Sequence, residues 1–354
     1  MRIAKKAETS GSQALLQRIG SVLLALVIAG VIIAAFGYHP IIVYKEMIIG
    51  ALGSGYCIKQ TILKIVPLLI MALGVSVCFR MNFINIGAEG QFYAGATAAT
   101  WVVLHQGAMP DWLAMLLLIL AAFVFGGLWC MFAGVLKVRL GVSETLVTLM
   151  LNYVAVKLVS YLQYNLWKDP NAYGYPKIAN YPVGLQLPQF AGIHCGWLAA
   201  IVLTILIALL MKRSKLGYEI TVLGKNRMAA RYAGMQTTRI ELLAGMLGGG
   251  LCGLAGMIQA SGFDHTLNDS MTSGMGFTAI VIAYMAKMEP GAIAVVSVLF
   301  AILTQGGSYI QSSMQIPAAA ADMMQGIILL FALGSEFFTS YKIVLDKPER
   351  GVRV

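Results

Sequence analysis

Four polar side chains gather between residues 82 and 91, in a part of the chain that is otherwise apolar. They are Asn82, Asn85, Glu89 and Gln91. Amide and carboxylate groups are costly inside a membrane unless they face protein or a water-filled route. Gly87 and Gly90 permit an irregular or broken helix, which favours a route for a polar solute. The alternative is a packing hub, in which Glu89 bonds neighbouring backbone and never touches a solute. The residues alone leave both roles open.

Two further polar residues belong to a helix that we predict over 143–165. Asn152 lies in its middle, where an amide is suited either to line a pore or to bond a neighbouring helix. Glu144 opens the helix directly after Ser143. We expect Ser143 to cap this helix and Glu144 to favour its dipole, in preference to a substrate or proton role for Glu144.

A short helix is predicted within the basic segment 212–240. Asn226 suits the N-cap and Gly234 the C′ position of a helix over Arg227–Ala233. A spacing of four residues places Met228 and Tyr232 on one face and Arg227 and Arg231 on another. The small side chains of Ala229, Ala230 and Ala233 keep the helix slim. Such a helix suits either a groove on a cytosolic partner or the surface of anionic membrane lipid.

Motifs for catalysis or metal binding are missing from the sequence. Gly224-Lys225-Asn226 lacks the upstream glycine and the hydroxyl residue of a phosphate-binding loop, so ATP hydrolysis is not expected on this chain. The four histidines are scattered, and the five cysteines show no paired spacing. We therefore expect no metal, no disulfide framework, no cofactor and no enzymatic activity.

The composition predicts a membrane protein. Hydrophobic residues make up 59% of the 354 residues, charged residues only 11%, and the mean hydropathy is +0.79. Soluble domains carry about 25% charged residues, so a soluble globular enzyme is excluded. The long apolar runs do not alternate with polar residues as the strands of a transmembrane barrel do. The expected fold class is therefore an all-α polytopic membrane protein.

About ten transmembrane helices are predicted, and small residues are expected to pack them closely. Gly245, Gly249 and Gly253 recur at every fourth residue of one span, which is typical of close helix contact. The third and eighth spans are interrupted by polar or glycine-rich stretches. The predicted spans are 19–37, 61–79, 84–104, 112–136, 143–165, 196–211, 241–261, 274–287, 290–311 and 320–340.

The basic residues predict the orientation. Most of the 25 Lys and Arg fall in segments that face the cytoplasm when the N-terminus does, which places both termini inside. An eight-span arrangement with two re-entrant segments keeps this orientation. The net charge of +10 is thus attributed to membrane topology, and no nucleic acid partner is expected. Residues 1–354 form one transmembrane domain in this scheme, with a cytoplasmic tail 1–18, an extracytoplasmic loop 166–195, a cytoplasmic loop 212–240 and a cytoplasmic tail 341–354.

Four separated stretches together resemble the permease subunits of ABC importers of the ribose/branched-chain amino acid type. The resemblance is closest to the branch that imports nucleosides, and it covers roughly residues 60–340. It departs at Arg227, where that family often has proline at the first helical position. The stretches are 85–91 (NIGAEGQ), 141–146 (GVSETL) with 151–153 (LNY), 224–235 (GKNRMAARYAGM) and 276–280 (GFTAI).

The resemblance implies a type II importer permease with inverted repeats between spans 2–5 and 7–10, in a prokaryotic plasma or inner membrane. It implies ABC ATP-binding subunits that bind the inside loops and carry the ATP and Mg, a second permease subunit, identical or paralogous, and an extracytoplasmic substrate-binding protein or lipoprotein. Asn226–Gly234 would be the coupling helix. The translocation-path candidates are Asn82, Asn85, Glu89, Gln91 and Asn152.

The solute implied by the resemblance is a nucleoside, with a simple sugar of the ribose type as the alternative. A third interpretation is a secondary transporter coupled to H⁺ or Na⁺ through Glu89, Glu144 or Asp322. That interpretation accounts for acids at membrane depth but not for the basic cytoplasmic loop.

Overall fold

The computed structural model describes residues 2–5, 11–317, 319–324, 326–327, 330–331, 334 and 341–344. Contacts divide the chain into two compact units. Unit 1 comprises residues 1–54 and 303–354, and unit 2 comprises residues 55–302. The helix α12 (Pro290–Ser313) begins in unit 2 and ends in unit 1.

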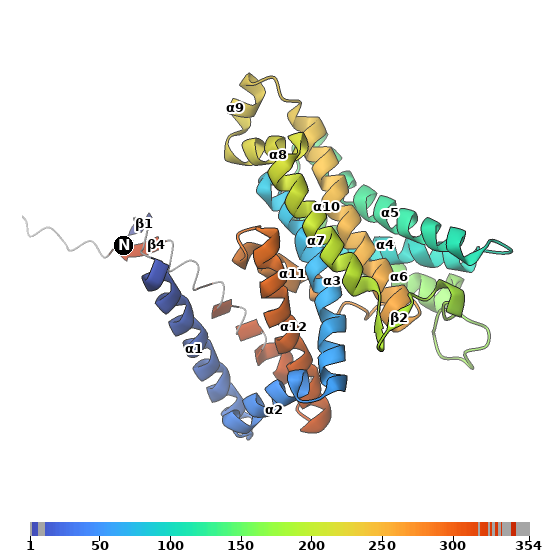
Figure 1. The fold of residues 1–354 in the computed structure, drawn as a ribbon, viewed down its shortest axis with the longest axis horizontal. Coiled ribbons are helices and arrows are strands. Elements are labelled where there is room, and N and C mark those ends of the chain that lie inside the picture. The colour runs from blue at the N-terminus through green and yellow to red at the C-terminus, as the bar shows by residue number, and fades with distance from the viewer. Residues whose placement is uncertain are drawn as a thin grey trace, which may run out of the picture. The chain divides into compact units, whose positions relative to one another are not determined.

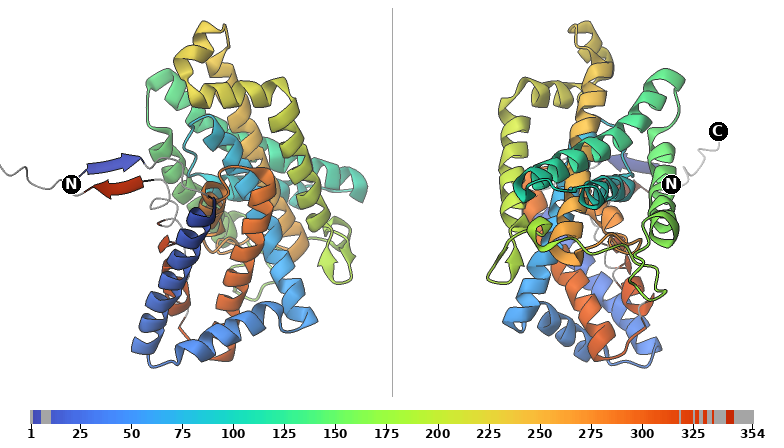
Figure 2. Two further views of the ribbon diagram at one scale, coloured as in Figure 1. Left: turned by 60° about the vertical axis from the view of Figure 1, so that its left-hand side comes forward. Right: turned by 90° about the vertical axis from the view of Figure 1, so that its right-hand side faces the viewer.

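Unit 2 is a bundle of helices (Figures 1 and 2). Its long apolar helices follow the runs of hydrophobic residues in the sequence. Short helices and irregular segments stand where glycine and polar residues interrupt those runs. Its helices are α3 (Gly55–Arg80), α4 (Ala88–Leu104), α5 (Asp111–Leu140), α6 (Glu144–Tyr161), α7 (Gly196–Arg213), α8 (Lys215–Lys225), α9 (Arg227–Tyr232), α10 (Thr237–Gln259) and α11 (Met275–Met285), with the start of α12.

Helix α10 is the central helix of unit 2, and its glycines let three neighbours approach closely. A Cβ at Gly253 would lie 2.2 Å from the backbone oxygen of Ala122 on α5, and one at Gly248 would lie 2.6 Å from that of Gly74 on α3. On α4, the backbone oxygen of Phe92 would lie 2.1 Å from a Cβ at Gly256. The prediction of close packing is thus confirmed, and it extends to more than one face of the helix.

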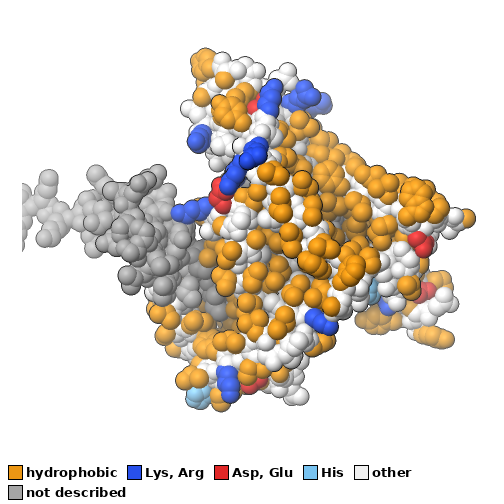
Figure 3. Space-filling view, in the orientation of Figure 1, with side chains coloured by type: hydrophobic (Ala, Val, Ile, Leu, Met, Phe, Trp, Pro, Cys, Tyr) orange, Lys and Arg blue, Asp and Glu red, His pale blue; other side chains and the backbone are white. Residues whose placement is uncertain are grey.

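Six helices are long and apolar enough to cross a membrane, within the part of the chain that the structure describes. A seventh span results if the bent pair Leu23–Ala35 and Pro40–Leu52 counts as one. The six are Gly55–Arg80, Asp111–Leu140, Glu144–Leu166, Gly196–Arg213, Thr237–Asp264 and Pro290–Ser313. Hydrophobic side chains cover much of the visible face of unit 2, while Lys and Arg gather mostly near α8 and α9 (Figure 3).

Among the described residues, six or seven of the roughly ten predicted spans are therefore found as helices of spanning length. Helix α4 has 17 residues and α11 has 11, because irregular glycine-containing segments precede both. Only about half of the predicted span 320–340 lies within the described residues. The structure also contains a helix that the sequence analysis missed, α2 (Pro40–Leu52), which has proline at its first position.

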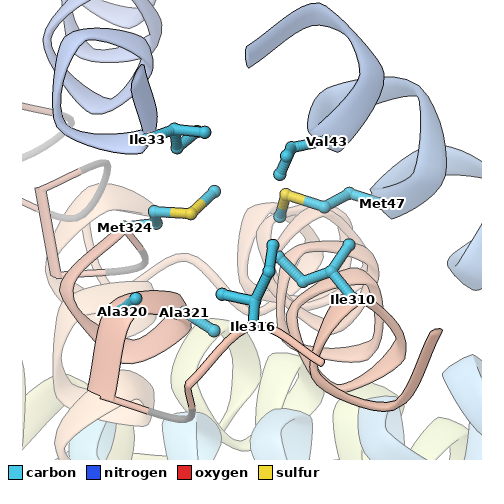
Figure 4. Close-up of a cluster of buried hydrophobic side chains, with 8 residues drawn as sticks. All are labelled: Ile33, Val43, Met47, Ile310, Ile316, Ala320, Ala321 and Met324. Atoms are coloured by element: carbon cyan, nitrogen blue, oxygen red, sulfur yellow. The ribbon is translucent and has the colours of Figure 1, made fainter. Parts of the chain in front are cut away.

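Unit 1 has its own small apolar core. Helix α1 (Gly11–Ala35) meets α2 at a bend of 111°, and a buried cluster joins their side chains to the end of α12 and the segment after it (Figure 4). Tyr309 lies against Gly50, where a Cβ would be only 2.1 Å from the ring. Strand β1 (Arg2–Lys5) pairs antiparallel with β4 (Tyr341–Val344). The cluster comprises Ile33, Val43, Met47, Ile310, Ile316, Ala320, Ala321 and Met324.

The loop 166–195 contains short ordered elements. It begins at the end of a π-helical turn (Leu162–Leu166), passes through a 3-10 turn (Val183–Leu185), and ends in a hairpin of β2 (Gln189–Phe190) and β3 (Ile193–His194). His194 is 1% exposed, and its Nδ1 accepts a hydrogen bond from the Gly196 backbone at 3.1 Å. Burial, with a smaller contribution from the charge of His265, lowers the pKa of His194 to about 4.

Candidate functional site

The polar stretch at the start of α4 is a buried, hydrogen-bonded hub. The side chains of Asn85 and Gln91 bond each other twice, at 2.8 and 3.1 Å. Asn85 Oδ1 also accepts from the Gly87 backbone at 2.9 Å. Asn85 is fully buried and Gln91 is 1% exposed. A buried amide requires partners, and these two residues supply them to each other while they shape the irregular chain that opens α4.

Asn152 joins this hub from α6. Its Nδ2 donates to the Ile86 backbone oxygen at 2.8 Å, and its Oδ1 accepts from the Gly90 backbone nitrogen at 2.8 Å. Thr148, one turn earlier, accepts from the Ile86 nitrogen at 3.1 Å. The side chains of α6 therefore satisfy the backbone groups that the broken start of α4 leaves unpaired. Sequence analysis missed Thr148, although its four-residue spacing from Asn152 places both on one face.

Glu89 connects α4 to α11. Its Oε2 accepts a hydrogen bond from the Gly276 backbone at 2.9 Å, and Thr272 Oγ1 donates to its Oε1. Gly274, with a φ of 82°, is the N-cap residue of α11. The carboxylate of Glu89 thus takes the place of a capping side chain at the N-terminus of α11, where negative charge is favoured. Sequence analysis missed Thr272, although a threonine shortly before a glycine often marks the start of a helix.

Asn82 lies apart from the hub. It has a φ of 59°, and its Nδ2 donates to the Gly224 backbone oxygen at 2.7 Å. Gly224 lies at the end of α8, and a Cβ there would be 1.8 Å from the Arg80 backbone oxygen. The structure therefore brings four of the five path candidates together and places the fifth against the end of α8. This geometry is that of the packing hub, and a role for these residues in a solute route stays a prediction.

Glu144 lies in the first turn of α6, as predicted, and it also makes an ion pair that was not predicted. Its Oε1 receives Lys137 Nζ at 2.7 Å, which joins the start of α6 to the end of α5. Ser143 is the N-cap residue by position, but its side chain makes no cap hydrogen bond. The predicted side-chain cap is therefore wrong, and the 3.1 Å bond from the Val147 nitrogen to the Ser143 backbone oxygen opens the helix.

The predicted helix in the basic loop exists as α9. Asn226 Oδ1 accepts from the backbone nitrogens of Met228 at 2.9 Å and Ala229 at 3.1 Å, so the predicted N-cap is confirmed. Gly234 follows with a φ of 74°, and the Met235 nitrogen bonds the Ala230 oxygen at 3.0 Å. These are the contacts of a glycine-terminated helix end. The preceding helix α8 is capped by Ser214, whose Oγ accepts from Gly217 at 3.0 Å.

The faces of α9 differ in part from the prediction. Met228 is 59% and Tyr232 is 87% exposed, so the apolar face is open as expected. Ala230 is fully buried, and it cannot contact a partner because its side of the helix packs against the chain itself. Arg227, which was expected to share a face with Arg231, places its Nη2 3.1 Å from Glu241 Oε1 on α10. Glu241 is 4% exposed, so this ion pair ties α9 to a helix of the bundle.

Comparisons with known proteins identify the family of this chain. Residues 57–333 match the family described as branched-chain amino acid transport system / permease component. The glucose ABC transporter permease protein TsgB13 of Haloferax volcanii is 32% identical, over 94% of this chain and 90% of that protein. The guanosine ABC transporter permease protein NupP of Bacillus subtilis is 28% identical, over 89% and 92%.

A solved structure described as an inward-facing conformation of a metal-chelate type ABC transporter is similar with a TM-score of 0.47 at 17% identity, over 92% of this chain and 99% of that one. The family match spans well over half of the chain, and the first relative covers nearly all of it. The chain therefore belongs to the branched-chain amino acid transport permease family: it is the multi-pass permease component of an ABC importer, not itself an ATPase, with no cofactor of its own and with ATP-binding subunits as its partners.

Proposed function

We propose that this chain forms the translocation path of an ATP-driven importer of nucleosides. The motifs that resemble the nucleoside branch support this solute, and so does the likeness to a guanosine permease and to the nucleoside permease protein NupB of Lactococcus lactis, which is 27% identical. The likeness to a glucose permease makes a simple sugar the second candidate. Both solutes carry ring hydroxyl groups, so both need polar contacts along the path.

The observation that carries the proposed mechanism is the exposed, doubly capped helix α9. A permease without an ATP site needs a rigid cytoplasmic element through which a partner can move it. Met228 and Tyr232 form an open apolar face that suits a groove on the ATP-binding subunit. Arg231, also exposed, suits acidic groups around that groove. The ion pair of Arg227 with Glu241 then links any movement of α9 to α10.

The proposed assembly follows the family. It contains a second permease subunit, identical or paralogous, and an extracytoplasmic substrate-binding protein or lipoprotein, in a prokaryotic plasma or inner membrane. The permease is one transmembrane domain of the type II importer fold with inverted repeats. Both α4 and α11 follow irregular glycine-containing segments, which is compatible with such a repeat. The tails 1–18 and 341–354 and the loop 212–240 face the cytoplasm, and the loop 166–195 faces outside.

Uptake by intact cells tests this function. Cells that produce the chain with its ATP-binding subunit and binding protein are given radiolabelled guanosine or radiolabelled glucose, with an uncoupler of the ion gradient as a separate arm. We expect guanosine accumulation that needs the ATP-binding subunit and survives the uncoupler while ATP is maintained. Accumulation of glucose alone would favour the sugar alternative. Uptake that is independent of the ATP-binding subunit and abolished by the uncoupler would contradict the proposal.

A further inference from the structure

Helix α6 exposes two different strips of side chains. Together with the π-helical turn after it, α6 forms the candidate span Glu144–Leu166, of which only 28% is buried. Asn152, Ala155 and Val159 are buried on the packed side. Figure 2 (right) shows α6, in green, at the edge of unit 2. Its outward side is therefore free to meet lipid, another subunit or a solute.

One strip is aliphatic and suits lipid. Val154 is 53% and Leu158 is 41% exposed, and their four-residue spacing places them on one face. Val147 and Leu151 continue the same face and are partly exposed. Nothing on this strip needs water, because all four side chains are hydrocarbon.

The other strip, which we call the tyrosine–lysine strip, is polar and aromatic. Tyr153, Lys157 and Tyr161 follow each other at four-residue spacing, and Tyr164 lies seven residues after Lys157. The three tyrosines are 62%, 53% and 56% exposed in chain order, and Lys157 is exposed as well. A strip of this composition is unsuited to lipid tails, so a different neighbour is required.

Lys157 lies at membrane depth. Thirteen residues after Glu144, at about 1.5 Å per residue, it is about 20 Å along the span, which is about two-thirds of a hydrocarbon core of about 30 Å. Within the described residues no ion pair or hydrogen bond engages its ammonium group. A charged residue at this depth ordinarily faces protein or a water-filled cavity.

An irregular polar segment lies directly beside this strip. Between the end of α10 and α11 the chain passes through Asn268, Asp269 and Ser270 without forming a helix. Ser160 of α6 donates to Asp269 Oδ2 at 2.7 Å. The Asp269 backbone is held on both sides, since Gln163 accepts from its nitrogen at 3.2 Å and Tyr93 donates to its oxygen at 2.8 Å. Irregular backbone at membrane depth is tolerated only where it is buried in protein or lines a water-filled cavity.

We propose that the tyrosine–lysine strip and Asp269 form a contact site for the sugar ring of the transported solute. A fixed carboxylate accepts hydrogen bonds from ring hydroxyls, the ammonium donates to them, and tyrosine rings cover the apolar face of the ring. Ribose in a nucleoside and a free hexose share this chemistry. The site rests on the proposed importer function and assigns to it residues that the sequence analysis did not select.

Cysteine labelling distinguishes solute, lipid and protein as the neighbour of the strip. The five native cysteines are replaced, and single variants Lys157→Cys and Tyr161→Cys are made, with Leu158→Cys on the aliphatic strip as the matched control. Cells are treated from outside with a membrane-impermeant thiol reagent, with and without guanosine or glucose. We expect labelling at 157 and 161 but not at 158, and protection by one of the two solutes, which also identifies the source of the sugar ring.

Each other labelling pattern would overturn the proposal. Labelling at 157 that neither solute reduces would show a hydrated surface without ligand contact. No labelling at 157 and 161, with disulfide cross-linking between two copies of the Lys157→Cys chain, would place a second permease on the strip. No labelling and no cross-link would show that the strip faces lipid and that Lys157 extends to the headgroups.

Transport kinetics test Asp269 separately. The Asp269→Asn variant keeps an oxygen that accepts from Ser160 but removes the charge, while Leu158→Ala is a control of the same helix. We expect Asp269→Asn to raise the KM for solute uptake at least about tenfold, as the loss of a charge-assisted hydrogen bond does, with the normal amount of assembled transporter in the membrane. An unchanged KM would overturn the contact. Absence of ATP-dependent uptake in the parent chain itself would instead refute the proposed function.

Discussion

The buried side chains of Glu89 and Asn152 are engaged with the protein itself. Glu89, 7% exposed, bonds the backbone of Gly276 and the hydroxyl of Thr272, and Asn152 bonds backbone on both sides of the break before α4. An unpaired polar group in such surroundings destabilises a fold by about 1–3 kcal/mol. The individual side chains therefore have structural effects that can be separated from effects on transport.

Replacing Glu89 tests the hub directly. We expect Glu89→Ala to reduce the free energy of unfolding by roughly 1–3 kcal/mol, because Gly276 N–H and the Thr272 hydroxyl lose their acceptor. The melting temperature and the monodisperse yield of the detergent-purified protein should both fall. Uptake should fall in proportion to the yield. Glu219→Ala removes a partly exposed acid whose partner Lys215 is 89% exposed, and it should change neither quantity. Normal yield and melting with lost uptake would instead place Glu89 in the solute route.

His194 predicts a pH dependence of stability. Its folded pKa of about 4 is below the unfolded value of about 6.5, so the unfolded chain binds a proton first as the pH falls. Stability is therefore full above about pH 6.5 and decreases between about 6.5 and 4. The melting temperature of the parent should fall when the pH is lowered from 7.5 to 5. In His194→Asn, whose amide oxygen can still accept from Gly196, we expect this fall to be smaller by a few degrees. Equal pH profiles would show that His194 does not titrate in this way.

At the scale of elements, the proposed coupling role of α9 rests on the ends and faces of this helix. Side-chain capping at Asn226 and the glycine at 234 define its ends. Ala229 is exposed while Ala230 is wholly buried. A substitution at Ala229 therefore tests binding to a partner, and one at Ala230 tests folding. These adjacent alanines therefore form a matched pair.

Aspartate at either alanine should have different effects. We expect Ala229→Asp to leave the yield of folded permease unchanged but to reduce co-purification of the ATP-binding subunit at least about tenfold, since an unpaired charge is costly in a docked contact. Ala230→Asp should lower the yield itself, because it buries a charge beneath the helix. Ala229→Ser is the control that keeps both normal. Full co-purification and uptake in Ala229→Asp would favour a helix that lies on lipid.

At the scale of the whole molecule, the six or seven candidate spans and the basic segments between them determine how the chain crosses the membrane. The longest loop without a spanning helix, 166–195, holds a hairpin and the exposed Asn171. The basic segment with α8 and α9 lies beyond the next span, α7. One crossing between them places these two segments on opposite sides of the membrane.

Labelling from outside tests this topology. In a chain without its native cysteines, Asn171→Cys should react with an impermeant thiol reagent in intact cells. Lys225→Cys, at the end of α8, should react only after the cells are lysed. The contrast follows because the basic loop is retained inside. Reaction of position 171 only after lysis would contradict the orientation and, with it, the cytoplasmic position of α9.

The sequence by itself determined what depends on neighbouring residues and on composition. Apolar runs identified the long spans α3, α5, α6, α7, α10 and α12, and Asn226 with Gly234 defined α9, because capping is local. The count of spans was less certain, since the glycine breaks before α4 and α11 shorten helices that composition alone extends. Ser143 makes no side-chain cap hydrogen bond, because its backbone oxygen alone can accept the first hydrogen bond of the helix.

Only the tertiary structure decided what the polar groups face. Glu89 and Gly276 are 187 residues apart in the chain. Arg227 on α9 forms an ion pair with Glu241 on α10. Periodicity identifies a face of a helix but not the neighbour of that face. From the sequence, Asn85, Gln91 and Asn152 suit a solute route and a packing hub equally well. The fold shows that Asn85 and Gln91 bond each other and that Asn152 bonds backbone, while their part in a solute route stays a prediction. Lys157 and Asp269 became a candidate site only when α6 and the irregular segment beside it were placed in contact.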